Sequence, residues 1–183
     1  MSIFVDGIID DCLVTNFPVF EDSRGEWRRV SDLANFETIT DGSSRAIKQV
    51  SVSINRLAGT VRGLHFLDAS QGEFKNVSCV RGSVLDVIVD LRKSSSTFGH
   101  VMKVELNAES TTSSVIIPPG CAHGFQTLQD DTILTYAMTA EYSKDFDFGI
   151  NPLDPELAIV WPLDISDVSP RDLALPTAQD FLA

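Results

Sequence analysis

The segment from Val61 to Phe66 contains the two residues of this chain best suited to acid–base and anion chemistry. Arg62 and His65 stand three positions apart in a strand-like run, with Gly63 between them. Side chains of a strand alternate between its faces, which places His65 on the face of Gly63 and Arg62 on the other. Because Gly63 leaves space beside it, His65 is a candidate general base at the floor of a pocket. A packed or surface histidine is the alternative.

Strands are the elements that must position these residues. Short alternating runs recur along the chain, separated by turn residues such as Arg81-Gly82 and Pro119-Gly120. Beside the segment around His65, the pattern predicts strands at 47–54, 74–80, 83–91, 101–106, 114–118, 124–128 and 132–142. Many short strands without a helical period between them indicate an all-β sandwich or barrel. Short helices are predicted only at 31–36 and after Ser169, where a proline follows the capping residue.

Size and composition restrict the kind of protein. The 183 residues, 43% of them hydrophobic, suit a single domain over residues 1–183. The formal charge of −12 argues against a nucleic-acid surface, so any anionic ligand must be met by a few local cations. No apolar run is long enough to span a membrane, and no secretory signal is visible. Three widely spaced cysteines fit neither a disulfide framework nor a zinc site, so a cytoplasmic protein is expected.

Several motifs follow one another in a fixed order. They are VRGLHF at 61–66, a lysine at 75, the apolar run 84–92, STFG at 96–99, IPPGCAHGF at 117–125 and VWPL at 160–163. In this order they resemble the dTDP-4-dehydrorhamnose 3,5-epimerase family, over a stretch from about Phe20 to Asp172. The resemblance implies a cupin jelly-roll barrel with short flanking helices, usually a homodimer. It also implies a cofactor-independent isomerase of nucleoside-diphosphate 4-keto-6-deoxy sugars, used in deoxysugar biosynthesis for surface polysaccharides such as lipopolysaccharide O-antigen.

Epimerisation beside a ketone needs a base, an acid on the opposite face and a group that stabilises the enolate. His65 is the candidate base. By resemblance, Asp172 is its carboxylate partner, although Asp172 also suits a helix-capping role reached from Ser169. Tyr136 is the candidate acid, with an ordinary strand aromatic as the alternative. Since Tyr136 and Tyr142 fall on one face of a predicted strand, both phenols are expected in the same compartment.

Lys75, as a catalytic candidate, and His123, as a substrate-binding one, complete the set of candidate site residues. Lys75 lies among apolar residues, which suggests a barrel interior facing an oxyanion, although an exposed edge-strand lysine has the same pattern. By resemblance, His123 lies near the sugar oxygens or supports Lys75. Asp86 either holds Lys75 or His123 by a buried ion pair or faces solvent. A metal-binding cupin would need clustered ligands. Because His65, His100 and His123 are far apart and no His-x-His occurs, no metal is expected.

Substrate binding is assigned mainly by resemblance. Arg24 and Arg62 match positions that meet the diphosphate, and paired guanidinium groups suit that task, with surface charge as the alternative. Phe20 and Trp27 fall near aromatic positions of the family and can stack on a base. The full set of candidate substrate-binding residues is Arg24, Arg62, Gln49, His123, Phe20, Trp27, Arg29, Glu141 and Tyr142.

Four positions depart from the family pattern: Arg29 replaces an acidic residue, Ser51 an asparagine, Ser78 an arginine and Glu141 an aromatic residue. Arg29 only donates hydrogen bonds, which suits N3 of cytosine rather than thymine, and Glu141 can accept from the cytosine amino group. These changes predict tighter binding of a CDP-linked than a dTDP-linked sugar. The pairing of Arg29 with a surface carboxylate is the alternative. Whether C3, C5 or both are inverted stays open.

Two further functions are compatible with the sequence. A cupin sugar-nucleotide 3,4-ketoisomerase would shift the ketone with a histidine pair arranged differently, whereas a catalytically silent sugar-nucleotide-binding cupin needs no acid or base. The combination of His65 with Tyr136 favours the epimerase.

Overall fold

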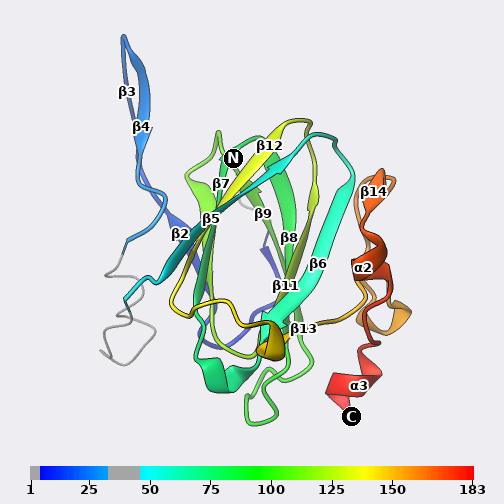
Figure 1. Ribbon diagram of the computed structural model, residues 1–183. Helices are drawn as coiled ribbons and strands as arrows, with labels where there is room; N and C mark the ends of the chain where they lie inside the picture. Colours follow the sequence, from blue (N-terminus) through cyan, green and yellow to red (C-terminus); the bar gives the residue numbers. More distant parts are fainter. Residues whose placement is uncertain (1–4, 33–45) are drawn as a thin grey trace.

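Strands make up most of the computed structural model, which describes residues 5–32 and 46–183 (Figure 1). A seven-stranded sheet has the order β1 (Val5–Asp6), β9 (Val101–Asn107), β8 (Ser83–Asp90), β11 (Cys121–Thr127), β6 (Thr60–Leu67), β13 (Asp147–Gly149), with β14 (Asp167–Val168) also pairing with β6. A five-stranded sheet has the order β2 (Leu13–Asn16), β10 (Thr112–Ile117), β7 (Lys75–Arg81), β12 (Thr132–Met138), β5 (Gln49–Asn55). A separate hairpin joins β3 (Val19–Asp22) and β4 (Gly25–Arg28).

The helices are short and flank the sheets. They are α2 (Pro170–Leu173), α3 (Gln179–Leu182) and three 3-10 turns at Ala69–Gln71, Lys144–Phe146 and Pro155–Leu157. None of the helices in the described ranges is long and apolar enough to cross a membrane. The fold therefore confirms the prediction of an all-β barrel with short flanking helices.

The main core lies between the two sheets and draws on both of them. Its buried members include Val77, Cys79, Val84, Ile88, Val104, Leu106, Val115, Ile117, Phe125 and Leu134. A second cluster covers the outer face of the seven-stranded sheet, where C-terminal residues such as Leu157 and Ala178 pack on Val87 and Val89. This C-terminal segment runs beside β6 in Figure 1. Because β8 is buried on both faces, its sequence reads as a nearly continuous apolar run.

Of the predicted elements, one helix is present as expected and one strand is shorter than expected. The proposed helix at 31–36 lies mostly outside the described residues, and residues 31 and 32 are not helical. The strand predicted to end at residue 142 ends at Met138. Beyond it, the Thr139 hydroxyl accepts the Phe74 amide at 2.9 Å, and the chain leaves the sheet. The helix after Ser169 is confirmed, since Ser169 Oγ accepts the N–H of Asp172 at 3.0 Å.

The alternation predicted for the segment around His65 is wrong. His65 pairs with His123 of β11, but Arg62 pairs with Phe125, so three steps along β6 match two steps along β11. The extra residue is a bulge, which brings Arg62 and His65 to the same pocket. The two backbones approach closely here, because a Cβ on Gly124 would lie 2.5 Å from the Arg62 carbonyl oxygen.

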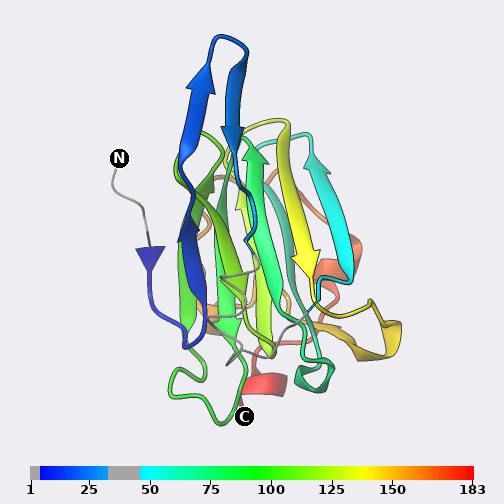
Figure 2. The same cartoon turned by 90° about the vertical axis from the view of Figure 1, so that its left-hand side faces the viewer.

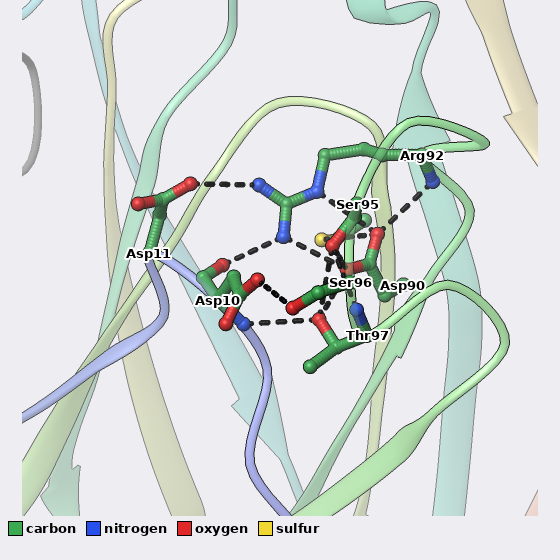
Figure 3. Close-up of polar contacts among 8 residues, drawn as sticks. Asp10, Asp11, Asp90, Arg92, Ser95, Ser96 and Thr97 are labelled. Carbon is green, nitrogen blue, oxygen red and sulfur yellow. Dashed lines mark hydrogen bonds and ion pairs between the residues drawn. The ribbon is translucent and has the colours of Figure 1, made fainter.

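A buried aspartate ties the loop after β8 to the N-terminal segment (Figure 3). The Asp90 carboxylate accepts Arg92 Nη2 at 2.8 Å and the Thr97 hydroxyl at 2.7 Å, and its side chain is fully buried. Arg92 also donates to the Asp10 carbonyl at 2.6 Å and to the Asp11 carboxylate at 3.0 Å. This network joins segments that are about 80 residues apart in the sequence.

Replacing Asp90 with asparagine is expected to reduce the free energy of unfolding by about 2 kcal/mol at pH 7. Burial alone would raise the pKa of Asp90, but hydrogen bonds from Arg92 and Ser95 outweigh it and lower the pKa from 3.8 to about 2. The carboxylate therefore stabilises the fold above pH 4, and this contribution is lost as the pH falls towards 2. Denaturant unfolding of both proteins between pH 7 and pH 2.5 measures the difference; a gap that stays constant would contradict this explanation.

Two apolar surfaces are exposed in the single chain, one on the five-stranded sheet and one on the hairpin. Along β5, Val50, Val52 and Ile54 are 71%, 59% and 65% exposed. The hairpin of β3 and β4 projects beyond the barrel, as Figures 1 and 2 show. It carries Phe20 and Trp27, whose rings lie 5.8 Å apart and are more than half exposed. Uncovered apolar surface of this kind marks a site of association.

Candidate active site

One pocket of about 320 Å³ collects all four residues predicted to be catalytic, His65, Lys75, Tyr136 and Asp172. It opens between β6, β7, β11, β12 and the segment around α2. Its lining includes the predicted residues Arg62, His65, Lys75, His123, Tyr136 and Asp172. The lining also includes Gly124, Phe125, Met138, Ser169 and Arg171, which the sequence reasoning did not assign to a site. Of these, only Arg171 carried a signal, as a cation next to a candidate catalytic carboxylate.

His65 and Asp172 form a hydrogen-bonded pair. His65 Nε2 lies 2.9 Å from Asp172 Oδ1, and the Gly63 amide donates to Asp172 Oδ2 at 3.1 Å. Burial opposes ionisation of Asp172, but the hydrogen bonds from His65 and Gly63 outweigh it and lower the pKa of this carboxyl. The ionised carboxylate fixes Nε2 as the protonated nitrogen, which leaves Nδ1 as the ring nitrogen that can accept a proton. The helix that begins after Ser169 carries Asp172 to this position.

Tyr136 projects from β12 into the same pocket. Its ring packs edge-on to the His123 ring, with 6.1 Å between the centroids. Burial, reinforced by the negative charge of Asp86, raises the pKa of the Tyr136 phenol far above its usual range. The phenol is therefore neutral at physiological pH and can donate a proton or a hydrogen bond.

Lys75 brings a cation to the pocket from the first position of β7. Its Nζ lies 3.1 Å from Oε2 of buried Glu73 and 3.4 Å from the His65 carbonyl oxygen. Val77 and Cys79, on the same face of β7, are fully buried in the core. The position of Lys75 in the pocket agrees with the first of its two predicted alternatives rather than with an exposed edge-strand lysine. Such a cation can stabilise an oxyanion that forms in the pocket.

His123 is held by a fully buried aspartate. His123 Nε2 lies 2.8 Å from Asp86 Oδ2, and no hydrogen-bond partner for Asp86 Oδ1 is present in the described part of the chain. Burial raises the pKa of Asp86, and the His123 contact acts in the opposite direction. The position of Asp86 in a buried pair, rather than facing solvent, agrees with one of the two predicted alternatives. The pair orients the His123 ring towards the pocket and Tyr136.

Three of the predicted substrate-binding residues lie outside this pocket near the end of β12. Gln49 accepts the Tyr142 amide at 2.7 Å, and Glu141 is exposed. Tyr142 does not share the compartment of Tyr136, because the strand ends before it; that prediction is wrong. Its hydroxyl instead donates to Asp147 Oδ2 at 3.1 Å. Arg171 donates to the same oxygen at 2.7 Å, which links Tyr142 to the pocket rim.

The N-terminal candidates are also separate from the pocket. Phe20, Arg24 and Trp27 line a hollow of their own on the hairpin, which extends away from the barrel in Figure 1. Arg24 pairs with Asp22 at 2.6 Å. Arg29 lies after the hairpin, and its Nη1 lies 2.6 Å from a carboxylate oxygen of Asp32. Within one chain, therefore, these residues are not brought to the candidate catalytic groups.

Within 5–32 and 46–183, no three or more histidine, cysteine, aspartate or glutamate side chains are grouped so that they could hold a metal ion.

The barrel and its pocket define an enzyme that moves protons. A histidine–carboxylate pair, a neutral phenol and a lysine line one cavity. The family model described as dTDP-4-dehydrorhamnose 3,5-epimerase matches residues 7–180. The chain belongs to this family of isomerases.

Individual relatives agree with the family assignment. A dTDP-4-dehydrorhamnose 3-epimerase of Streptomyces niveus is 39% identical over 165 residues, which cover 87% of this chain and 77% of that protein. A dTDP-4-dehydrorhamnose 3,5-epimerase of Mycobacterium tuberculosis is 39% identical over 158 residues, covering 81% and 77%. Among solved structures, an epimerase of Legionella pneumophila in complex with dTDP-4-keto-L-rhamnose superimposes with a TM-score of 0.84 at 31% identity, covering 99% and 97%.

Proposed function

We propose that this protein epimerises a dTDP-linked 4-keto-6-deoxyhexose at C3, at C5 or at both, in deoxysugar biosynthesis. The observation that carries the proposal is the pocket in which the His65–Asp172 pair and the neutral phenol of Tyr136 line one cavity. Family membership supports the substrate class, since the relatives named above act on or bind dTDP-linked sugars of this kind. A cytoplasmic location and a role in O-antigen assembly stay predictions.

The reaction begins with proton removal. His65 Nδ1 takes the proton from the carbon beside the C4 ketone, and the C–H electron pair moves to form an enolate with its charge on the C4 oxygen. Lys75 and His123 stabilise that oxygen. Asp172 stabilises the imidazolium that His65 becomes.

Inversion is completed by a second proton transfer. Tyr136 donates its phenolic proton to the same carbon from the opposite face, and the ketone re-forms. Because burial raises the pKa of Tyr136, the phenolate that remains is strongly basic and recovers a proton from solvent readily. The proton on His65 is lost to solvent in turn. The enzyme is thereby restored without a cofactor.

The nucleotide base is proposed to be thymine. The cytosine hypothesis required Arg29 to donate to the base, but the guanidinium of Arg29 is engaged by Asp32. This pairing is the alternative use of Arg29 considered for the sequence. Because Arg29 is paired with Asp32, the dTDP-linked sugars named for the relatives favour thymine.

We also propose that the protein is a homodimer. The exposed row of Val50, Val52 and Ile54 on the edge strand β5 supports an apolar contact between copies. The projecting hairpin supports the same proposal, since Phe20 and Arg24 line a hollow on the hairpin and not the pocket of their own chain. In a dimer, the hairpin of one chain can supply these residues to the pocket of the other.

Deuterium exchange tests the proposed reaction. With a dTDP-4-keto-6-deoxyhexose in D₂O, the protein is expected to incorporate deuterium at C3, C5 or both, because every inversion passes through an enolate. NMR spectra resolve the two carbons and their configurations. Protein inactivated by heat serves as the control for spontaneous exchange.

Two outcomes would contradict the proposal. Binding of the sugar nucleotide without any label above the control would indicate a catalytically silent binding protein. Movement of the ketone from C4 to C3 would indicate a ketoisomerase.

A further inference from the structure

We propose that Asn55 is a positioning residue that holds Arg62 ready for the diphosphate of the substrate. The inference rests on the proposed function, because it takes a nucleoside diphosphate sugar as the ligand. Asn55 closes β5 at the edge of the five-stranded sheet, whereas Arg62 lies on β6 of the other sheet. The contact between them therefore bridges the two sheets.

The contact fixes one side of the guanidinium. Arg62 Nε donates to Asn55 Oδ1 at 2.8 Å, and Asn55 Nδ2 donates to the Thr132 carbonyl at 3.2 Å. The Ser53 hydroxyl also donates to Asn55 Oδ1, at 3.3 Å. Since Asn55 is 98% buried, its amide has little freedom to turn. Arg62 is thus held by Nε, which leaves its two Nη groups to meet a ligand.

The neutrality of Asn55 is the second observation. In the described part of this acidic chain, six arginines form ion pairs with carboxylates; they are Arg24, Arg28, Arg29, Arg81, Arg92 and Arg171. Within the described residues, Arg62 forms no such ion pair. Its side chain instead donates to the neutral amide of Asn55. An amide oxygen orients a guanidinium without cancelling its charge. The full positive charge then stays available to an anion.

The location suits the linkage between sugar and nucleoside. Arg62 lines the candidate active site and also a neighbouring cleft of about 610 Å³, which Ile54, Asn55 and Leu57 help to form. Arg62 is therefore shared by the two hollows. If the sugar of the substrate occupies the active site and its nucleoside occupies the neighbouring cleft, the diphosphate between them must lie beside Arg62. Paired Nη donors match two phosphate oxygens there.

Asn55→Asp tests the role of neutrality. The aspartate keeps an oxygen for Nε but adds a charge that pairs with Arg62, so affinity for thymidine diphosphate is expected to fall by about tenfold. Affinity for thymidine, which has no phosphate, should not change. The turnover number at saturating substrate should stay within about threefold while KM rises, because Arg62 binds the diphosphate before and during the reaction alike.

The experiment is a calorimetric titration of the full chain with thymidine diphosphate and with thymidine. Asn107→Asp, which makes the same chemical change at the end of β9, is the matched control and should bind like the wild type. Asn55→Ser removes the amide without adding charge, and its affinity for thymidine diphosphate should fall by about threefold. This variant tests the role of Asn55 if the aspartate variant fails to fold. Melting curves verify folding of each variant.

The outcomes separate the two proposals. If the wild type binds thymidine diphosphate but Asn55→Asp and Asn55→Ser bind it equally well, the role of Asn55 is overturned and the proposed function stands. If both variants lose thymidine and thymidine diphosphate to the same extent, the role is merely structural and the inference also fails. If the wild type binds thymidine diphosphate no better than thymidine, the proposed function fails together with the inference.

Discussion

Replacing His65 with asparagine is expected to abolish deuterium exchange at both carbons beside the ketone, lowering its rate by roughly 10²- to 10⁴-fold. The reason is that His65 lines the pocket and its Nε2 is held by the Asp172 carboxylate, which leaves Nδ1 to accept the proton. Asparagine can still donate to Asp172, so the fold should be preserved. The measurement is the NMR exchange assay in D₂O, with melting curves to verify folding.

The control for this experiment is His100→Asn. His100 is exposed, lies just before β9 and does not line the pocket, so its replacement should leave exchange unchanged. Near-wild-type exchange in the His65 variant would remove His65 as the base. His123, the other histidine of the pocket, would then be the candidate base.

The sequence predicted the barrel because its strands are separated by strong turn residues. The turns at Arg81-Gly82 and Pro119-Gly120 do separate β7 from β8 and β10 from β11. Period alone, however, cannot tell which face of a strand is inside. The apolar row at Val50, Val52 and Ile54 is exposed, whereas the polar Asn55 at the end of the same edge strand is buried.

The catalytic pair was predicted through family resemblance rather than through spacing. His65 and Asp172 are 107 residues apart, and without the resemblance Asp172 was better explained as a helix cap. In the structure Ser169 is the helix cap, and Asp172 is the residue that it caps. Its backbone N–H donates to Ser169 while its carboxylate holds the His65 ring.

Local departures from regular strands explain the failed predictions. The bulge opposite Gly124 turns Arg62 to the same side as His65, and no periodic pattern in the sequence indicates where a bulge falls. The early end of β12 at Met138 removes Tyr142 from the face of Tyr136. The partner of Arg62, Asn55, was missed because side-chain contacts between two sheets leave no signal in sequence spacing.

Replacing Tyr136 with phenylalanine is expected to separate inversion from exchange. His65 can still remove the proton and return deuterium from its own face, so label should enter with the original configuration. Inversion should fall by roughly 10²-fold or more, since general-acid assistance on the opposite face is lost. The NMR assay measures label and configuration at C3 and C5 separately. The buried, neutral state of the Tyr136 phenol is the physical basis for this expectation.

Tyr142→Phe is the matched comparison, because it removes the same hydroxyl from an exposed tyrosine outside the pocket. Its hydroxyl contacts Asp147, so any effect should change exchange and inversion by the same factor. Equal loss of exchange and inversion in Tyr136→Phe would contradict the acid role and assign Tyr136 to the shape of the pocket. If instead inversion is lost at one carbon and kept at the other, water or His123 must protonate the second carbon. A single phenol would then set which centre this enzyme inverts, since the carbon nearest Tyr136 is the one that receives its proton.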